Sequence, residues 1–336
     1  MDIPSLLRKA LLNPSVYPDH PEEVRSIETH ISLLFLTGND VYKIKKPVDY
    51  GFLDFTTLEK RRFFCEQEVK LNRRLSSGIY LGVVAITLDR GRISLNGPGE
   101  VIEYAVRMKQ VPEDLFMDRL LKANRVTEKM IEAVSEKLFR FYLTAETSDH
   151  IKRFAKPGRI KQDTDENFEQ TRKYIEVTIS REVFTEIQER TNRFFKTQEE
   201  VFDQRIVSGW IRDCHGDLRL EQILWGEEIA ILDCIEFNER FRYTDVAADI
   251  GFLAMDLDYH GREDLGEHLI RTYILKSGDD GLPKVLDFYK CYRAYVRGKV
   301  ESFRLDDPST PENERKEAVK RAQKYFDLSL RYALRF

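Results

Sequence analysis

Long hydrophobic stretches are missing from this sequence. No apolar run approaches the ~20 residues that a membrane-spanning helix requires. Residues 1–18 carry one short apolar patch, broken by Arg8 and Lys9, and they lack the small-residue cleavage site of a secretion signal. We therefore expect a cytoplasmic protein that does not contact membranes.

Cysteine is also scarce. The chain has four cysteines, and no two of them form a C-x-x-C pair: Cys65, Cys214, Cys234 and Cys291. This spacing argues against a zinc site or a disulfide scaffold and favours a reducing compartment.

Positive charge is not in excess. The 54 Lys and Arg residues are outnumbered by 58 Asp and Glu residues, which gives a net charge of −4. A dedicated nucleic-acid-binding protein would usually be clearly basic, so we expect no nucleic-acid partner. With 336 residues, 42% of them hydrophobic, the chain is long enough to form two domains or lobes.

The first 108 residues have the pattern of strands around a single helix. The run ISLLFLTGNDVYKIKKPV contains two strand-like segments separated by a turn at residues 37–40, which is typical of a β-hairpin. Residues 56–59 (Thr-Thr-Leu-Glu) have the spacing of a capping box, so we expect a helix over 57–75. Further strands are expected in LGVVAITLD, GRISLN and VIEYAVRM. These elements predict a small β-rich N-terminal lobe over 1–108.

Helical periodicity dominates residues 109–336. Apolar residues recur at helical spacing after Thr127, as in Met130, Val134, Leu138 and Phe141. The polar stretch 148–167, which contains Pro157 and Gly158, is expected to be a mobile loop. A short strand-turn-strand region is expected within 211–237. The sequence therefore predicts an α+β chain with a larger, mainly helical C-terminal lobe.

The strongest chemical signal lies in residues 213–237, which include CHGDLRLEQIL and IAILDCIEF. Phosphoryl transfer needs an acidic residue beside the attacking hydroxyl and oxygen ligands for the metal that bridges the phosphates. Asp217 in a turn fits the first role, and Gln222 and Asp233 fit the second. Pairing of 223–225 with 229–232 would place Asp233 near the catalytic loop. A polar turn with an exposed Asp is the alternative, but the combined pattern favours catalysis.

A lysine-bearing strand and a carboxylate on the next helix form a second candidate pair. Alternation along residues 41–45 places Lys43 and Lys45 on one face. Glu68 falls within an apolar helical stripe formed by Phe64, Leu71 and Leu75. A carboxylate on a buried face needs a partner, because an unpaired charge there is costly. We expect that partner to be Lys45, with Lys43 as the alternative; a solvated strand face is the other interpretation of both lysines.

These motifs resemble a known family. His215-Gly216-Asp217-Leu218, the five-residue offset to Gln222 and the later Asp233 resemble the catalytic and metal loops of the aminoglycoside phosphotransferases. Over nearly its whole length the chain also resembles uncharacterised bacterial proteins whose kinase-like domain is often fused to a P-loop kinase domain. The segments that carry this resemblance are VYKIKKPVDYGFLDF, LEKRRFFCEQE, CHGDLRLEQI, ILDCIEFNERFRY and DVAADIGFLAMDLD.

The resemblance implies a two-lobed, protein-kinase-like fold and a small-molecule kinase that uses ATP or GTP with Mg²⁺ on a substrate hydroxyl. In such a protein Asp217 matches the catalytic Asp and Asp233 the metal-binding Asp. Lys45, paired with Glu68, would hold the α/β-phosphates. Two features would support the catalytic loop rather than perform chemistry: His215, and the Asp-x-Ala-x-Asp element that runs from Asp245 to Asp249.

Other features of the resemblance leave alternatives open. The family usually has Asn where this chain has Gln222, which reaches about one bond further, and Mg²⁺ tolerates displaced ligands poorly. Arg219 either contacts the transferred phosphate or is solvated. The segment 103–110 would form the hinge, where the backbone at Met108 and Gln110 would read the base.

The rival interpretation is a nucleotide-binding regulatory module with little turnover. Such a module would act through a partner such as a separate P-loop kinase, because this chain contains no G-x-x-x-x-G-K-[ST] motif. The altered Gln222 favours the module, whereas the intact Asp217, Asp233, Lys45 and Glu68 favour the enzyme.

Overall fold

The computed structural model describes residues 3–336, which form two compact units. The first unit extends to Ala123 and also includes Glu221–Glu239, and the second comprises Asn124–Leu220 and Arg240–Phe336. The division therefore differs from the expected boundary at residue 108. The later segment joins the first unit because its apolar residues pack into that unit's core, beside Val69, Tyr80 and Val106: Leu224, Ala230 and Leu232.

The first unit is built on a six-stranded antiparallel sheet with the order β1-β2-β3-β6-β4-β5. Its strands are β1 (Arg25–Glu28), β2 (Ser32–Leu36), β3 (Asp40–Lys45), β4 (Tyr80–Asp89), β5 (Arg92–Leu95) and β6 (Glu100–Lys109). The predicted hairpin is present between β2 and β3, where Gly38 adopts a φ of 92° that favours glycine. The three later strands also match the prediction.

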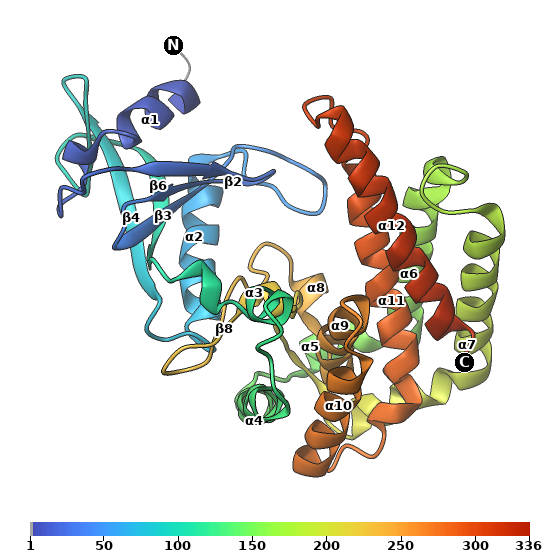
Figure 1. Cartoon of the computed structure of the whole chain (residues 1–336). Helices are drawn as coiled ribbons and strands as arrows, with labels where there is room; N and C mark the ends of the chain where they lie inside the picture. The colour runs from blue at the N-terminus through green and yellow to red at the C-terminus, as the bar shows by residue number, and fades with distance from the viewer. Residues whose placement is uncertain (1–2) are drawn as a thin grey trace. The chain divides into compact units, whose positions relative to one another are not determined.

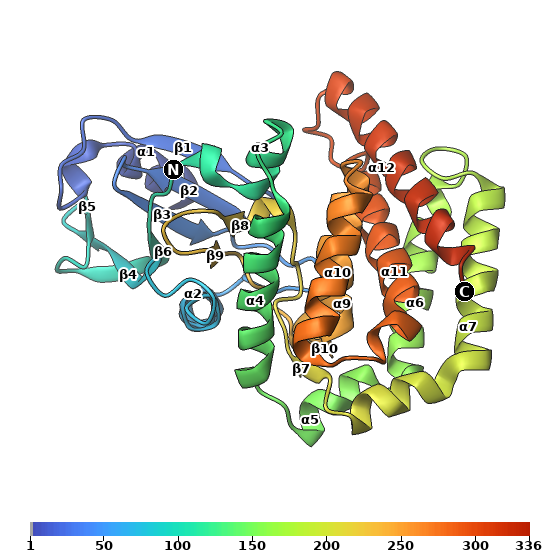
Figure 2. The ribbon, with the colours of Figure 1, turned by 60° about the horizontal axis from the view of Figure 1, so that its bottom comes forward.

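Two helices lie on opposite faces of this sheet, α1 (Ile3–Leu11) and α2 (Leu58–Asn72) (Figures 1 and 2). On β3, Tyr42 and Ile44 pack in the core that includes α1, so the alternating lysines face α2. The predicted helix is confirmed, but its N-cap is Thr57, whose hydroxyl accepts a hydrogen bond from the Lys60 N–H at 3.2 Å. The cap therefore lies one residue after the start of the expected capping box.

Short elements complete the first unit. After η1 (Pro14–Val16) and the sheet come η2 (Glu113–Leu115) and α3 (Met117–Lys122), and later η5 (Leu220–Gln222) leads into a small hairpin. Its strands, β8 (Ile223–Leu224) and β9 (Ala230–Ile231), pair antiparallel as predicted. Asp233 follows this hairpin directly.

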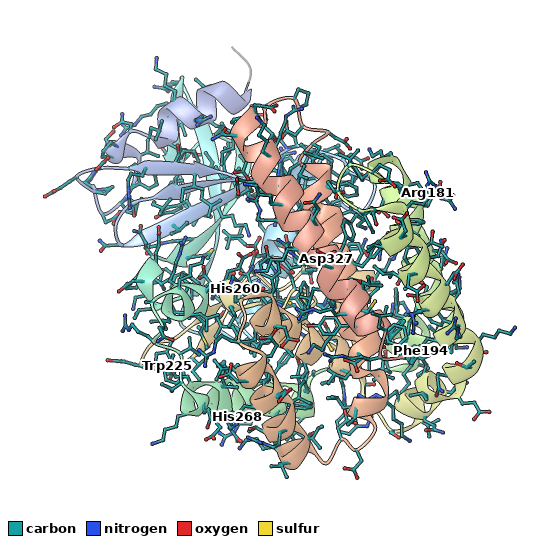
Figure 3. The ribbon with its side chains drawn as sticks, turned by 45° about the vertical axis from the view of Figure 1, so that its right-hand side comes forward. Arg181, Phe194, Trp225, His260, His268 and Asp327 are labelled. Atoms are coloured by element: carbon teal, nitrogen blue, oxygen red, sulfur yellow. The ribbon has the colours of Figure 1, made fainter. Side chains whose placement is uncertain are left out.

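The second unit is mainly helical. Its helices are α4 (Glu128–Thr144), α5 (Asp149–Lys152), η3 (Arg153–Ala155), α6 (Pro157–Thr171), η4 (Arg172–Tyr174), α7 (Arg181–Val207), α8 (Glu239–Arg242), α9 (Val246–Tyr259), α10 (Glu263–Ser277), α11 (Leu282–Phe303) and α12 (Glu312–Ala333). The strands β7 (Ile211–Asp213) and β10 (Tyr243–Asp245) pair antiparallel. The buried helix α9 packs against α10 and α11, and α12 packs on α11. In Figure 3, Arg181 and Phe194 mark α7, and Asp327 marks α12.

The expected mobile loop at 148–167 is wrong, because this stretch is helical. Ser148 caps α5 by accepting a hydrogen bond from the Ile151 N–H at 3.3 Å. Pro157 stands in the first turn of α6, where its missing N–H and fixed φ are compatible with a helix. Ile160 is buried one turn further on, so tertiary packing supports the helix.

Across residues 3–336, no helix combines the length and the apolar character needed to cross a bilayer.

Candidate active site

The predicted contact between Lys45 and Glu68 is present in the first unit. Lys45 Nζ lies 2.6 Å from Glu68 Oε2, and the Lys45 side chain is only 1% exposed. Its ammonium also contacts the carboxylate of Glu236, a residue that the sequence reasoning did not single out. Lys45 is therefore a buried cation held by two carboxylates.

Lys43 also contacts Glu68, and it contacts Asp233 as well. Its Nζ lies 2.8 Å from Glu68 Oε1 and 2.8 Å from Asp233 Oδ1. The Lys43 side chain is 15% exposed and that of Asp233 is 48% exposed. Both lysines thus reach Glu68, but Lys43 is the one that joins it to the predicted metal ligand.

The charges in this cluster stabilise each other. Burial favours neutral lysines, but the surrounding carboxylates outweigh it and raise the pKa of both Lys43 and Lys45. Burial would likewise raise the pKa of Glu68, yet the two ammonium groups lower it. The pKa of Glu236 is raised, chiefly by burial and partly by the nearby Glu68. Both lysines and Glu68 are therefore charged at neutral pH.

The residues predicted to hold Mg²⁺ come from adjacent backbone segments. The Leu232 N–H donates a hydrogen bond of 2.8 Å to the carbonyl oxygen of Gln222, which places Gln222 beside the residue that precedes Asp233. The half-exposed carboxylate of Asp233 is a hard oxygen ligand of the kind that Mg²⁺ prefers. Mg²⁺ is usually held by one or two carboxylates together with substrate phosphates, so Asp233 fits this role.

The hinge backbone is largely engaged within the first unit. Met108 pairs with Val41 on one side and Tyr80 on the other, because β6 is an inner strand. The Gln110 N–H donates to the Asn39 carbonyl at 2.7 Å, and the Gln110 side-chain oxygen accepts from the Gly38 N–H at 3.0 Å. The Gln110 N–H was expected to contact the nucleotide base, but it already donates its hydrogen bond within the first unit.

In the second unit, Asp217 forms an ion pair with Arg219. Arg219 donates to both carboxylate oxygens, with Nε–Oδ1 at 3.0 Å and Nη2–Oδ2 at 2.8 Å. Arg219 is buried, so the solvated alternative is wrong. Burial would raise the pKa of Asp217, but the guanidinium of Arg219 holds that pKa well below its usual range.

The backbone of the Asp217 loop is fixed by buried side chains. The His215 and Gly216 N–H groups donate to the two oxygens of Asp249, at 2.7 and 2.9 Å. The Asp217 N–H donates to His215 Nδ1 at 3.3 Å, which agrees with an anchoring role for that imidazole. The Leu220 N–H donates to Asp256 Oδ2 at 2.9 Å. The loop is therefore held in place from helix α9.

The expected bracing residue, Asp245, makes other contacts. It caps α9 by accepting from the Ala247 N–H at 2.8 Å, and it forms a two-point ion pair with Arg205. Asp249, four residues later, is the carboxylate that binds the backbone of the Asp217 loop. The predicted Asp-x-Ala-x-Asp element therefore braces this loop through its second Asp.

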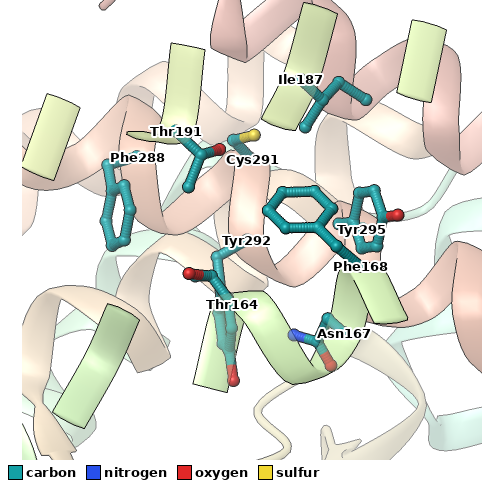
Figure 4. Close-up of a pocket in the computed structure, with 9 residues that line it drawn as sticks. All are labelled: Thr164, Asn167, Phe168, Ile187, Thr191, Phe288, Cys291, Tyr292 and Tyr295. Carbon is teal, nitrogen blue, oxygen red and sulfur yellow. The ribbon is translucent and has the colours of Figure 1, made fainter. Parts of the chain in front are cut away.

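A small cavity lies between α6, α7 and α11 in the second unit (Figure 4). Its volume is about 10 Å³, roughly the space that one water molecule needs. Its lining is mainly aromatic and aliphatic, with Phe168, Ile187, Phe288 and Tyr295. This cavity is therefore too small to receive an acceptor substrate.

The chain matches no known family model. It is 34% identical over 279 residues to uncharacterised proteins of Mycobacterium bovis and of two Mycobacterium tuberculosis strains. The aligned region covers 83% of this chain and 54% of each relative. The chain thus spans about half the length of the curated relatives it matches.

Among solved structures, the chain is similar to a choline/ethanolamine kinase family protein from Mesorhizobium loti, with a TM-score of 0.51 and 12% identity. The match covers 98% of this chain and 100% of that one. The chain has a protein-kinase-like fold. A putative aminoglycoside phosphotransferase from Ralstonia eutropha is also similar, with 14% identity, 98% coverage of each chain and a TM-score of 0.45.

The kinase-like fold expected from the sequence resemblance is thus confirmed. Three buried residues around the candidate groups were missed, namely Tyr80, Glu236 and Asp256. Their partners depend on tertiary contacts that span at least 36 positions in the chain.

Proposed function

We propose that this kinase-like chain transfers the γ-phosphate of ATP or GTP, with Mg²⁺, to the hydroxyl of a small molecule. The observation that carries the proposal is the placement of Lys43 between Glu68 and the half-exposed Asp233. A lysine oriented by a helix carboxylate beside a metal-binding Asp is the arrangement that kinases use to hold nucleotide phosphates.

The phosphate-binding role is assigned to Lys43 rather than to Lys45. A phosphate must reach the ammonium, and Lys45 is fully buried against Glu68 and Glu236. Lys43 keeps some exposure and contacts the more accessible carboxylate. Lys45 then has a positioning role, because its charge holds Glu68 in the place where Lys43 meets it.

Asp233 and Gln222 are the proposed protein ligands of Mg²⁺. When bound, this ion would neutralise charge on the β- and γ-phosphates. The carboxylate of Asp233 would exchange part of its contact with Lys43 for the metal, and Gln222 would supply an amide oxygen. Lys43 would then be free to turn its ammonium toward the phosphates.

Asp217 is the proposed base for the acceptor. It would orient the hydroxyl and take its proton as the hydroxyl oxygen forms a bond to the γ-phosphorus. The bond from phosphorus to the β–γ bridging oxygen breaks, and the nucleoside diphosphate leaves. Arg219 must release at least one oxygen of Asp217 for this step, and its guanidinium can then stabilise charge on the transferred group.

An alcohol is the proposed class of acceptor. The similar Mesorhizobium loti protein belongs to a choline/ethanolamine kinase family, and choline and ethanolamine are small amino alcohols. This supports a small hydroxyl-bearing substrate for the present chain.

The second candidate is a nucleotide-binding regulatory module with little turnover. The two-point ion pair between Arg219 and Asp217 favours it, because this contact occupies the proposed base. Gln222 in place of the family's usual Asn adds support. A separate protein, such as a P-loop kinase, is the proposed partner of such a module.

A nucleotide screen distinguishes the two candidates. The melting temperature is measured with ATP and with GTP, each with and without Mg²⁺, and formation of the nucleoside diphosphate is measured, with and without alcohol acceptors, for any nucleotide that stabilises the protein. The kinase proposal predicts Mg²⁺-dependent stabilisation together with turnover once an alcohol acceptor is present. Stabilisation without turnover across a panel of alcohols supports the module. The absence of stabilisation by either nucleotide at millimolar concentration contradicts both.

A further inference from the structure

Asp233 adopts an unusual backbone conformation. Its φ is 60°, in the left-handed region that residues with a side chain rarely occupy. Such a conformation persists where the surrounding structure holds it in place. The question is therefore which groups fix the backbone of the proposed metal ligand.

Two buried side chains bind this backbone directly. The Asp233 N–H donates a hydrogen bond to the Tyr80 hydroxyl at 3.1 Å. The next N–H, of Cys234, donates to Asn72 Oδ1 at 2.9 Å. Tyr80 begins β4, Asn72 ends α2, and both are buried. Two consecutive amides are thus held by side chains from two different elements.

Asn72 also links this backbone to the Glu68 segment. Its Nδ2 donates to the Glu68 carbonyl oxygen at 2.9 Å, one turn earlier on the same helix. The side chain of Glu68 in turn contacts Lys43, which contacts Asp233. The backbone and the side chain of Asp233 are therefore both tied to α2.

We propose that Tyr80 and Asn72 are positioning residues that fix the left-handed backbone at Asp233 and so direct its carboxylate toward Lys43 and a nucleotide-bound Mg²⁺. The inference rests on the proposed function, because it assumes that Asp233 binds the metal. Neither residue touches the reacting atoms. Each acts through the orientation of Asp233.

The chemistry of the phenol suits this role. The Tyr80 hydroxyl oxygen accepts the hydrogen bond from the Asp233 N–H at 3.1 Å. A Phe at this position would fill nearly the same space but would leave the N–H without its acceptor.

The test uses Tyr80→Phe with a matched control. Tyr17 is equally buried in the same unit, on the α1 side of the sheet, and its hydroxyl donates to the Leu11 carbonyl. The affinity for ATP is measured by calorimetry with and without Mg²⁺ for wild type, Tyr80→Phe and Tyr17→Phe. We expect the enhancement by Mg²⁺ to fall by about threefold to tenfold in Tyr80→Phe, the usual effect of one lost buried hydrogen bond. Binding without Mg²⁺ should stay near the wild-type value, and Tyr17→Phe should keep the full enhancement.

The possible outcomes separate this inference from the proposed function. If Mg²⁺ does not change the ATP affinity of the wild type, the proposed function is contradicted, and so is the positioning role that depends on it. A wild type that responds to Mg²⁺ and a Tyr80→Phe variant with the same enhancement overturn the positioning role alone. If Tyr80→Phe does not fold, Asn72→Ala serves as the test. This substitution removes the acceptor of the Cys234 N–H, so it should also lower the enhancement of ATP affinity by Mg²⁺. An unchanged enhancement would overturn the positioning role.

Discussion

The lysine cluster of the first unit and the Asp217–Arg219 pair of the second unit hold their charges differently. In the lysine cluster, Lys43 and Lys45 share Glu68, and each has one further carboxylate, so each lysine and Glu68 has two oppositely charged partners. In the second-unit pair, Arg219 donates to both carboxylate oxygens of Asp217. The shared cluster can give up one contact and remain paired, whereas the contact between Arg219 and Asp217 must open before Asp217 can act.

This difference predicts which substitutions affect nucleotide binding and which affect turnover. A polyanion such as a nucleotide can take the place of one carboxylate beside Lys43 without leaving a buried charge unpaired, because Glu68 stays in contact. An acceptor hydroxyl must instead compete with a guanidinium for Asp217. Nucleotide binding should therefore depend on the first unit, and turnover on the state of the Asp217–Arg219 pair.

Asp217→Asn should have the largest effect on turnover. It keeps the volume of the side chain but removes the proton acceptor, so kcat should fall by roughly two to four orders of magnitude. Nucleotide affinity should change little, because the first-unit cluster is intact. Steady-state kinetics measures kcat, and calorimetry measures the nucleotide affinity. A variant that loses nucleotide affinity together with kcat would show that Asp217 also contributes to nucleotide binding.

Lys45→Met should have the largest effect on stability. The substitution keeps an unbranched side chain but removes the charge between Glu68 and Glu236, which leaves a buried carboxylate without its partner. The free energy of unfolding should fall by about 3–5 kcal/mol. Urea unfolding measures this loss, with Lys46→Met as the control on the same chain segment, where the side chain is more exposed. Equal stability of the two variants would mean that the shared cluster does not stabilise the fold.

Arg219→Ala should shift the pH dependence of activity. Arg219 keeps the pKa of Asp217 low against the effect of burial, so its removal leaves burial to raise that pKa. Asp217 would then be protonated at a higher pH, and the acidic limb of kcat/KM should move upward. Arg219→Lys keeps a positive charge without the two-point contact and should shift the limb less. An unchanged or lowered acidic limb would contradict the assignment of Asp217 as the base.

Local patterns predicted much of the first unit. Alternation in β3 showed that both lysines share a face, and the apolar stripe of α2 showed that Glu68 is buried. The same alternation could not tell Lys43 from Lys45, because their difference depends on Glu236, 191 positions from Lys45. The error at 148–167 has a similar origin. Pro157 and Gly158 are turn-like in composition, but the burial of Ile160 against the rest of the unit is a tertiary effect.

Calorimetry on Lys43→Ala tests whether Lys43, held by Glu68 and Asp233, binds the nucleotide phosphates. The matched control is Lys46→Ala, a neighbouring lysine paired with Glu28 at 2.6 Å. ATP with Mg²⁺ is titrated into wild type and both variants, and urea unfolding checks that each variant is folded. We predict that Lys46→Ala keeps the wild-type affinity and that Lys43→Ala weakens it by at least about tenfold, the expected effect of losing one charged contact. Wild-type affinity in a folded Lys43→Ala variant would contradict a phosphate-binding role for Lys43.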